Sequence, residues 1–195
     1  VVARLMMNHK RQDVALRGFR AVRDALPSRR MRLVLVGEGP HRDEILAERD
    51  RLGLGDDVIL PGFSERTWET HAAIDVALMP SAREGYGFTF VEAMAAGCCA
   101  IGTEVGIVPE LLGDPALGWR VPVDDEPAFH AAMLAAARLD DDARRAMGLR
   151  GREVVRARFD MHRQLRRIAT LVGAAPDGDW APDRPSPATA SFALR

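Results

Sequence analysis

Two glutamates, Glu84 and Glu92, lie on either side of a glycine-containing segment and are the residues best placed for chemistry. Gly85 and Gly87 allow the backbone between them to turn tightly or to approach a ligand closely. A carboxylate repels an anion such as a phosphate, so we expect Glu84 and Glu92 to accept hydrogen bonds from hydroxyl groups of a ligand. The spacing places one acid at the mouth of a site and the other along its wall.

Two cations, Arg4 and Lys10, follow the first apolar run, and Lys10 is the only lysine among the 27 basic residues. A lysine presents a compact ammonium where an arginine presents a planar fork. We expect Arg4 and Lys10 to lie on the same edge of the fold as Glu84, where they can bind a diphosphate together. The alternative is that both are solvated loop charges.

A strand, a loop and a helix must hold the glutamates. The apolar run over residues 74–79 has the length of a strand buried on both faces. Residues 88–97 carry helix formers and end at Gly97, which suits a helix C-terminus. A helix N-terminus after a glycine-bearing loop binds anions readily. The stretch therefore predicts a site for a ligand with both phosphates and hydroxyls, which is a nucleotide or a nucleotide-sugar.

Apolar runs and helical periodicity alternate along the chain. We expect strands at residues 1–5, 31–36, 58–60, 74–79, 100–101 and 118–121, and helices at 11–26, 44–52, 65–73, 88–97, 108–112, 126–139, 141–159 and 161–172. This alternation predicts right-handed βαβ units in an α/β fold, a Rossmann-like doubly wound parallel sheet of about six strands followed by C-terminal helices. Ligands bind such sheets beyond the carboxyl ends of the strands. The loops at residues 4–10, 37–40, 61–63, 81–87 and 103–106 fall on that edge.

Composition narrows the function classes. The 195 residues are 47% apolar and 28% charged with a formal net charge of −1, so nothing points to nucleic acid as a partner. No apolar run has the length needed to span a bilayer. Cys98 and Cys99 are adjacent, which suits buried strand residues better than a disulfide. We expect a cytoplasmic protein, and peripheral association at the inner membrane face stays open. We expect the five histidines to lie at the surface.

The stretch from Pro80-Ser81 through Glu84 and Glu92-Ala-Met-Ala to Gly97 resembles the E-x7-E signature of retaining glycosyltransferases with the two-domain GT-B fold, often called family 4. The resemblance extends from Val1 to about residue 159. It implies the C-terminal, donor-binding half of that fold at residues 1–173 and an absent N-terminal acceptor domain. The last residues are rich in Pro, Ala, Asp and Ser and show no periodicity, which predicts a disordered tail at 174–195.

The resemblance also implies roles for individual residues. Glu84, Arg4 and Lys10 would be the catalytic residues: Glu84 would bond the donor sugar's hydroxyls, and the two cations would hold the diphosphate. Glu92 would bond the ribose. The donor-binding residues would be Gly37, Gly39, Leu60, Gly62, Gly85, Tyr86, Gly87, Phe88, Thr89 and Glu92. No cofactor and no metal are expected, since no His/Cys/Asp cluster has metal-ligand spacing.

Three positions depart from the family pattern. Lys10 lies six positions after Arg4 where five is common, Cys99 replaces a usual proline, and Ile107 replaces a frequent glycine. We expect the isoleucine to narrow a loop near the donor site and to alter which sugar fits.

The sequence thus indicates a glycosyltransferase that moves a sugar from a nucleoside-diphosphate-sugar to an acceptor hydroxyl with retention, this chain supplying the donor site. The acceptor, a glycan, a lipid or a small molecule, is not identified. Two alternatives stay open: a GT-B-fold nucleotide-sugar epimerase and a non-catalytic nucleotide-sugar-binding module.

Overall fold

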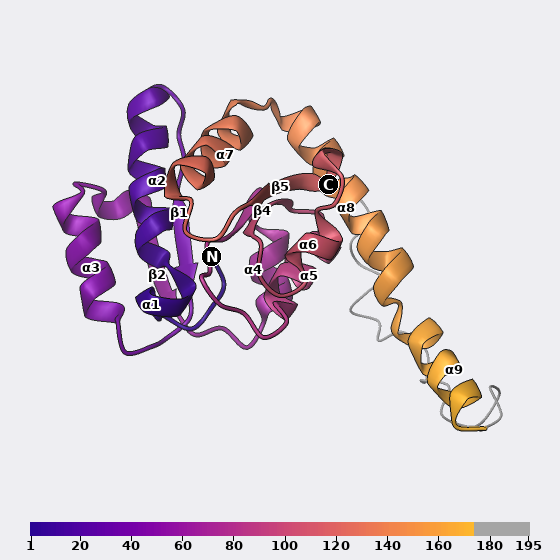
Figure 1. Cartoon of the computed structure of the whole chain (residues 1–195). Helices are drawn as coiled ribbons and strands as arrows, with labels where there is room; N and C mark the ends of the chain where they lie inside the picture. Colours follow the sequence, from indigo (N-terminus) through magenta and orange to yellow (C-terminus); the bar gives the residue numbers. More distant parts are fainter. Residues whose placement is uncertain (174–195) are drawn as a thin grey trace. The chain divides into compact units, whose positions relative to one another are not determined.

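The computed structural model describes residues 1–173, apart from the side chains of residues 161–163 (Figure 1). The tail expected at residues 174–195 lies outside the described residues. The chain divides into two compact units, Val1–Ala157 and Arg158–Arg195. The boundary falls inside the helix Asp141–Phe159, earlier than the expected domain end at residue 173.

The first unit alternates strands and helices as the sequence predicts. The strands are β1 (Leu33–Val36), β2 (Val58–Gly62), β3 (Val76–Met79), β4 (Cys99–Thr103) and β5 (Gly118–Val121). The α-helices are α1 (Met7–Lys10), α2 (Gln12–Ala25), α3 (Arg42–Arg51), α4 (Thr67–Ala72), α5 (Phe88–Ala96), α6 (Val108–Leu111), α7 (Glu126–Arg138) and α8 (Asp141–Phe159), with 3₁₀ turns at Gly55–Asp57 and Pro115–Leu117. In the second unit, α9 runs over Met161–Leu171.

All strand pairs of the described chain are parallel. β1 pairs with β2, and β3, β4 and β5 form a second group in that order. The strand expected at residues 1–5 forms only a single bridge, between Val2 and Val36, so five strands are formed where about six were predicted. Few residues run beside β1 before the backbone turns into α1, which leaves room for one bridge. The predicted α/β fold with a parallel sheet is confirmed.

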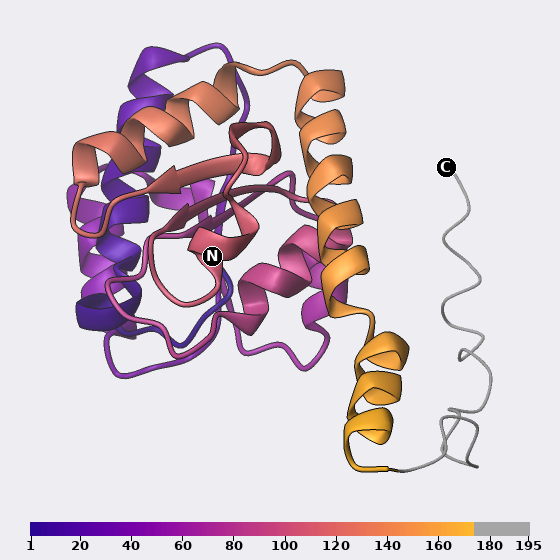
Figure 2. The ribbon, with the colours of Figure 1, turned by 45° about the vertical axis from the view of Figure 1, so that its right-hand side comes forward.

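Helices cover both faces of the sheet, as the doubly wound prediction requires. In β3, Leu78 belongs to the main buried cluster with residues of α2 and α7, whereas its neighbour Ala77 packs with Ala93 of α5. Successive strand residues point to opposite faces, so these two contacts lie on opposite sides of β3. Figure 2 shows α7 on one side of the strands and α5 on the other.

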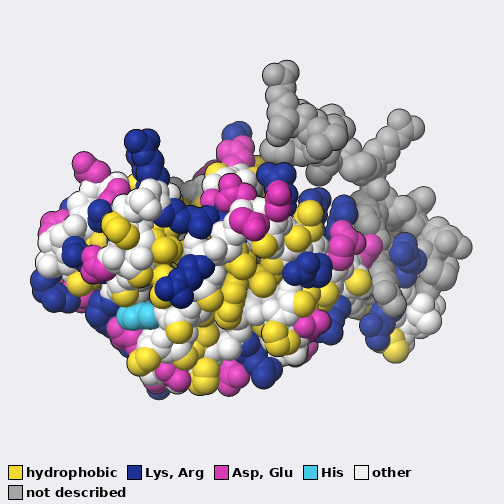
Figure 3. All heavy atoms as spheres, turned by 90° about the horizontal axis from the view of Figure 1, so that it is seen from above, with side chains coloured by type: hydrophobic (Ala, Val, Ile, Leu, Met, Phe, Trp, Pro, Cys, Tyr) yellow, Lys and Arg dark blue, Asp and Glu magenta, His cyan; other side chains and the backbone are white. Residues whose placement is uncertain are grey.

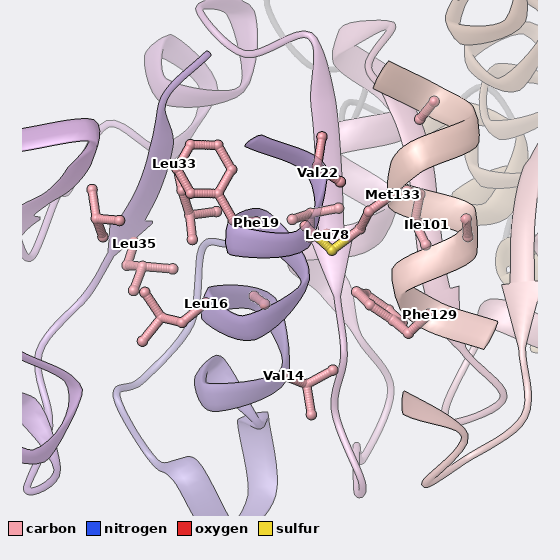
Figure 4. Close-up of a cluster of buried hydrophobic side chains, with 14 of the residues drawn as sticks. Val14, Leu16, Phe19, Val22, Leu33, Leu35, Leu78, Ile101, Phe129 and Met133 are labelled. Carbon is pink, nitrogen blue, oxygen red and sulfur yellow. The ribbon is translucent and has the colours of Figure 1, made fainter. Parts of the chain in front are cut away.

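The main cluster forms where α2 packs against α7. Figure 4 shows its side chains converging from the two helices and three strands: Val14, Leu16, Phe19, Val22, Leu33, Leu35, Leu78, Ile101, Phe129 and Met133. Phe129 is 1% exposed and Ile101 is fully buried. This core fixes the strands whose carboxyl ends carry the loops of interest.

Both cysteines are buried and free, as expected of small strand residues. Burial raises the pKa of Cys98 to about 12 and that of Cys99 to about 11. The two thiols are therefore neutral at physiological pH and serve packing.

Charged side chains are mixed on the surface. On the face seen in Figure 3, basic and acidic groups alternate with apolar ones. No helix of the described chain is both long enough and apolar enough to cross a membrane.

Candidate active site

The loops at the carboxyl ends of the strands are joined to one another by backbone hydrogen bonds. The amide of Leu5 donates to the Glu38 carbonyl (3.0 Å), and that of Ala82 donates to the His9 carbonyl (2.8 Å). The Ile107 amide donates to the Tyr86 carbonyl (2.8 Å). Segments far apart in sequence therefore form one continuous edge, which is where a parallel sheet binds ligands.

An ion pair joins two of the three residues expected to be catalytic. The Lys10 ammonium lies 2.5 Å from Glu84 Oε1, with the lysine side chain 21% exposed and the glutamate 10% exposed. The loop expected at residues 4–10 contains the one-turn helix α1, which ends at Lys10 and was not predicted. Arg4 is exposed and forms no ion pair with another described residue. Its carbonyl accepts a hydrogen bond from the buried Gln12 amide (2.9 Å).

Ser81 also bonds the glutamate. Its hydroxyl lies 3.0 Å from Glu84 Oε1. Its carbonyl accepts from the Thr103 hydroxyl at 2.5 Å, and both Ser81 and Thr103 are buried. Thr103 ends β4, the strand beside β3. Ser81 lies within the motif, but the sequence alone suggested no role for it in the site. Thr103 lies outside the motif and gave no sequence signal.

The start of α5 presents unpaired backbone amides beside the Lys10–Glu84 ion pair. The helix begins after Gly87, which has a left-handed φ of 96° that favours glycine. The amides of Phe90 and Val91 donate to the Gly87 carbonyl. Within the described residues, the amides of Phe88 and Thr89 have no acceptor. Together with the helix dipole, these donors favour an anion at this point.

Glu92, the second glutamate of the motif, lies one turn further along α5 and contacts a buried histidine. Its Oε2 is 3.6 Å from His71 Nε2; the Glu92 side chain is 48% exposed and that of His71 is 3% exposed. His71 lines a small cavity together with Glu84, Ser81 and Thr89. The histidines were expected at the surface, which is wrong for His71, because α4 packs this residue against α5.

Two of the expected glycines, Gly37 and Gly39, lie where backbones approach closely, whereas Gly62 faces only the end of a side chain. A Cβ on Gly37 would collide with the Ala3 carbonyl, and one on Gly39 would collide with the Leu5 backbone. A Cβ on Gly62 would lie 2.8 Å from Glu38 Oε1. Close packing between the first two loops thus accounts for Gly37 and Gly39. Their contact with a donor stays a prediction.

Aromatic side chains border the site. The rings of Tyr86 and Phe88 lie 4.6 Å apart, and Phe88 is 69% exposed. Phe63, in the loop after β2, is 72% exposed. Leu60 is only partly buried and packs against the main cluster. Gly85 has open space around it.

Ile107 supports the loop from within. Its side chain is 3% exposed, and its Cγ2 lies 3.6 Å from where a Cβ on Gly87 would stand. The buried side chain packs beneath the start of α5 and does not line an open surface. An effect on sugar choice would therefore act through the position of α5.

Among the described residues, no group of three or more His, Cys, Asp or Glu side chains is arranged to hold a metal ion. The polar groups at this edge are one carboxylate paired with an ammonium, a second carboxylate beside a histidine, and helix amides. Such a set suits a ligand that carries both anionic and hydroxyl groups.

Comparison with known proteins agrees with this arrangement. Residues 1–138 match the family described as glycosyl transferases group 1. The N-acetyl-alpha-D-glucosaminyl L-malate synthase of Bacillus anthracis is 31% identical over 140 residues, which is 72% of this chain and 36% of that protein. The chain therefore spans well under half of the length of this relative.

Solved structures show the same fold. Alr3699/HepE of Anabaena, in complex with UDP and glucose, matches with a TM-score of 0.77 and 21% identity over 88% of this chain and 47% of that one. The C-terminal domain of the group 1 glycosyl transferase LpcC from Francisella tularensis matches with a TM-score of 0.69 and 23% identity, over 80% of this chain and 82% of that one. With its carboxyl-edge site and its match over residues 1–138, this chain belongs to the glycosyl transferases group 1 family.

Proposed function

We propose that this chain supplies the nucleoside-diphosphate-sugar site of a retaining glycosyltransferase. The observation that carries the proposal is the Lys10–Glu84 ion pair beside the N-terminus of α5. One edge of the sheet thus presents a cation, a carboxylate and backbone amides together, and these are the groups that a nucleotide-sugar requires.

The diphosphate would lie against the positive groups. Lys10 would contribute its ammonium, Arg4 its exposed guanidinium, and α5 the amides of Phe88 and Thr89. Negative charge grows on the diphosphate as it departs, and pre-positioned donors at that point lower the barrier. Lys10 would then exchange part of its contact with Glu84 for the phosphate oxygens.

The hydroxyls would lie against the carboxylates. Both recorded hydrogen bonds to Glu84 involve Oε1. Its Oε2 would accept from a hydroxyl of the donor sugar. Glu92 is half exposed on α5 and would accept from the ribose hydroxyls. Tyr86, Phe88 and Gly62 would border the rest of the ligand.

The transfer itself breaks the bond between the anomeric carbon and the diphosphate oxygen, and forms one between that carbon and the acceptor oxygen. The acceptor hydroxyl gives up its proton, and the diphosphate leaves with the electron pair of the broken bond. Positive charge develops on the sugar ring meanwhile. With retention, the acceptor attacks from the face that the diphosphate leaves, so the departing diphosphate is itself the base nearest that proton.

The relatives support the choice of donor. HepE was solved with UDP and glucose, and the Bacillus anthracis enzyme is named for a glucosaminyl group joined to malate. Of these two descriptions, only that of HepE names a nucleotide, and it makes UDP the first nucleotide to test. Because the chain spans 36% of the Bacillus anthracis protein, the acceptor and the complete activity are proposed for a longer assembly.

Proton NMR of the chain with UDP-glucose, UDP-N-acetylglucosamine, GDP-mannose and ADP-glucose tests the donor site and tests this proposal against the epimerase alternative. We expect line broadening of one donor series without chemical change. Appearance of an epimer in the absence of acceptor would support the epimerase instead. Rapid transfer to an added acceptor would show that this chain also holds the acceptor site, which contradicts a donor-only role.

A further inference from the structure

We infer that Ser81 is a positioning residue for Glu84, which fixes the carboxylate so that one oxygen faces the donor sugar. The inference rests on the proposed function and assigns a role to a residue outside the roles set out above. It follows from two hydrogen bonds that end on the same serine.

The first bond orients the carboxylate. Ser81 Oγ donates to Glu84 Oε1 at 3.0 Å, and the Lys10 ammonium approaches the same oxygen. With two donors on Oε1, the rotation of the carboxyl group is fixed. Within the described chain no hydrogen bond reaches Oε2, so this oxygen retains its capacity to accept from a ligand.

The second bond anchors the serine. Thr103 Oγ1 lies 2.5 Å from the Ser81 carbonyl and 3.2 Å from that of Met79. Thr103 stands at the end of β4, where its backbone pairs with β5. The end of a rigid strand thus holds the first residues of the loop that carries Glu84. These hydrogen bonds fix the position of the loop relative to the sheet.

Ser81 itself is too buried to touch a ligand. The residue is 2% exposed, whereas Glu84 keeps 10% of its side chain exposed. Its contribution to binding must therefore pass through the glutamate. Glu84 contacts the sugar in the proposed complex, so Ser81 matters for nucleotide-sugars and not for free nucleotides.

Calorimetric titration of Ser81→Ala with a nucleotide and its nucleotide-sugar, for example UDP and UDP-glucose, tests this. Without Ser81 the Glu84 carboxylate is less well oriented and its hydrogen bond to the donor sugar weakens. A typical hydrogen bond contributes a factor of up to about ten, so the affinity for the sugar-nucleotide should fall about fivefold to tenfold. The affinity for UDP should stay within about twofold. Ser81→Thr, which keeps a hydroxyl, should restore sugar-nucleotide binding. Ser28→Ala, at an exposed serine on the opposite edge, is the matched control.

A double variant keeps the test independent of folding losses. In a Glu84→Ala background, Ser81→Ala should weaken sugar-nucleotide binding no further, because its route of action is gone. Thermal unfolding of each variant shows whether the threonine methyl is accommodated. Where it is not, the double variant decides.

The outcomes distinguish a failure of the proposed donor site from a failure of the role inferred for Ser81. If the wild-type chain binds no nucleotide, the proposed function fails and the inference falls with it. If the wild type binds but Ser81→Ala binds UDP-glucose equally well, the inference alone is overturned. An equal loss for UDP and UDP-glucose would assign Ser81 a structural role only, which also overturns it.

Discussion

The Lys10 ammonium lies 2.5 Å from Glu84 Oε1, although the two residues are 74 positions apart in sequence. One comes from the loop after the first extended segment and the other from the loop after β3. The fold therefore joins opposite charges from two separate loops, and both charges are largely shielded from solvent. Without a ligand, the Lys10 ammonium and the Glu84 carboxylate form an ion pair with each other.

This pairing predicts that Lys10 and Glu84 are coupled in stability. Lys10→Ala and Glu84→Ala should each lower the free energy of unfolding by about 1–3 kcal/mol, because each leaves the other charge without its partner. The double variant should lose less than the sum of the two. Urea unfolding of the four proteins measures the coupling. Additive losses would show that the pair contributes nothing as a pair.

The loop that carries Glu84 should depend on the glycine of the neighbouring loop. Gly106 has a φ of +54°, and a Cβ there would collide with the Tyr86 carbonyl and lie 3.2 Å from Glu84 Cβ. Gly106→Ala should lower the free energy of unfolding by about 1–3 kcal/mol through strain and should also weaken binding of UDP-glucose.

Gly113→Ala is its control, since the nearest atom to a Cβ there is 3.9 Å away. Urea unfolding of both variants compares them. Equal stability of the two would contradict the close packing of these loops.

The buried His71 predicts a pH dependence of stability. Burial lowers the pKa of His71 below its usual value of 6.5, although the Glu92 carboxylate opposes the shift. The unfolded state therefore gains a proton near pH 6.5 that the folded state binds only at lower pH. Stability should fall as pH decreases below about 6.5, by at most about 1.4 kcal/mol per pH unit from this group.

His71→Gln isolates this effect. The first amino group of the chain, whose pKa burial lowers to about 5, acts in the same direction in both proteins and cancels in their difference. Urea unfolding between pH 7.5 and 5.5 should show the wild type losing more stability than the variant. Parallel profiles would mean that His71 is already protonated, or that it gains its proton equally in both states.

The two cysteines should be unreactive in the folded protein. Burial raises the pKa of Cys98 to about 12 and that of Cys99 to about 11, so neither forms a thiolate at pH 8. A colorimetric thiol reagent should label neither cysteine in buffer and both in denaturant. Fast labelling of the native protein would contradict the burial of the strand that carries Cys99.

The alternation of apolar runs and helical periods was enough to predict the fold. β3, β4 and β5 were each expected near their observed positions, because buried parallel strands are short continuous apolar runs. The first segment was expected to be a full strand, since Val1 and Val2 suit one. Only the structure shows that the chain turns into α1 after a single bridge.

The sequence proposed candidate site residues one by one, and their role in binding a donor stays a prediction. Glu84 was proposed from the motif and Lys10 from the loop at residues 4–10. Their contact depends on the relative position of two loops, which no local pattern encodes. His71 and Thr103 were missed because a lone histidine or threonine in an ordinary stretch gives no signal. Their importance arises from burial, which is a property of the packed chain.

The most direct test of the donor site is calorimetric titration of this chain with UDP, GDP and ADP and with their sugar derivatives, beside Lys10→Ala and Glu92→Ala. We expect saturable binding of one nucleotide series, with affinity lowered at least about tenfold in both variants, since each removes a charge-assisted contact. Undiminished binding in both variants would place the ligand elsewhere. An absence of binding by the folded wild-type chain would contradict the proposal that this chain holds a donor site of its own.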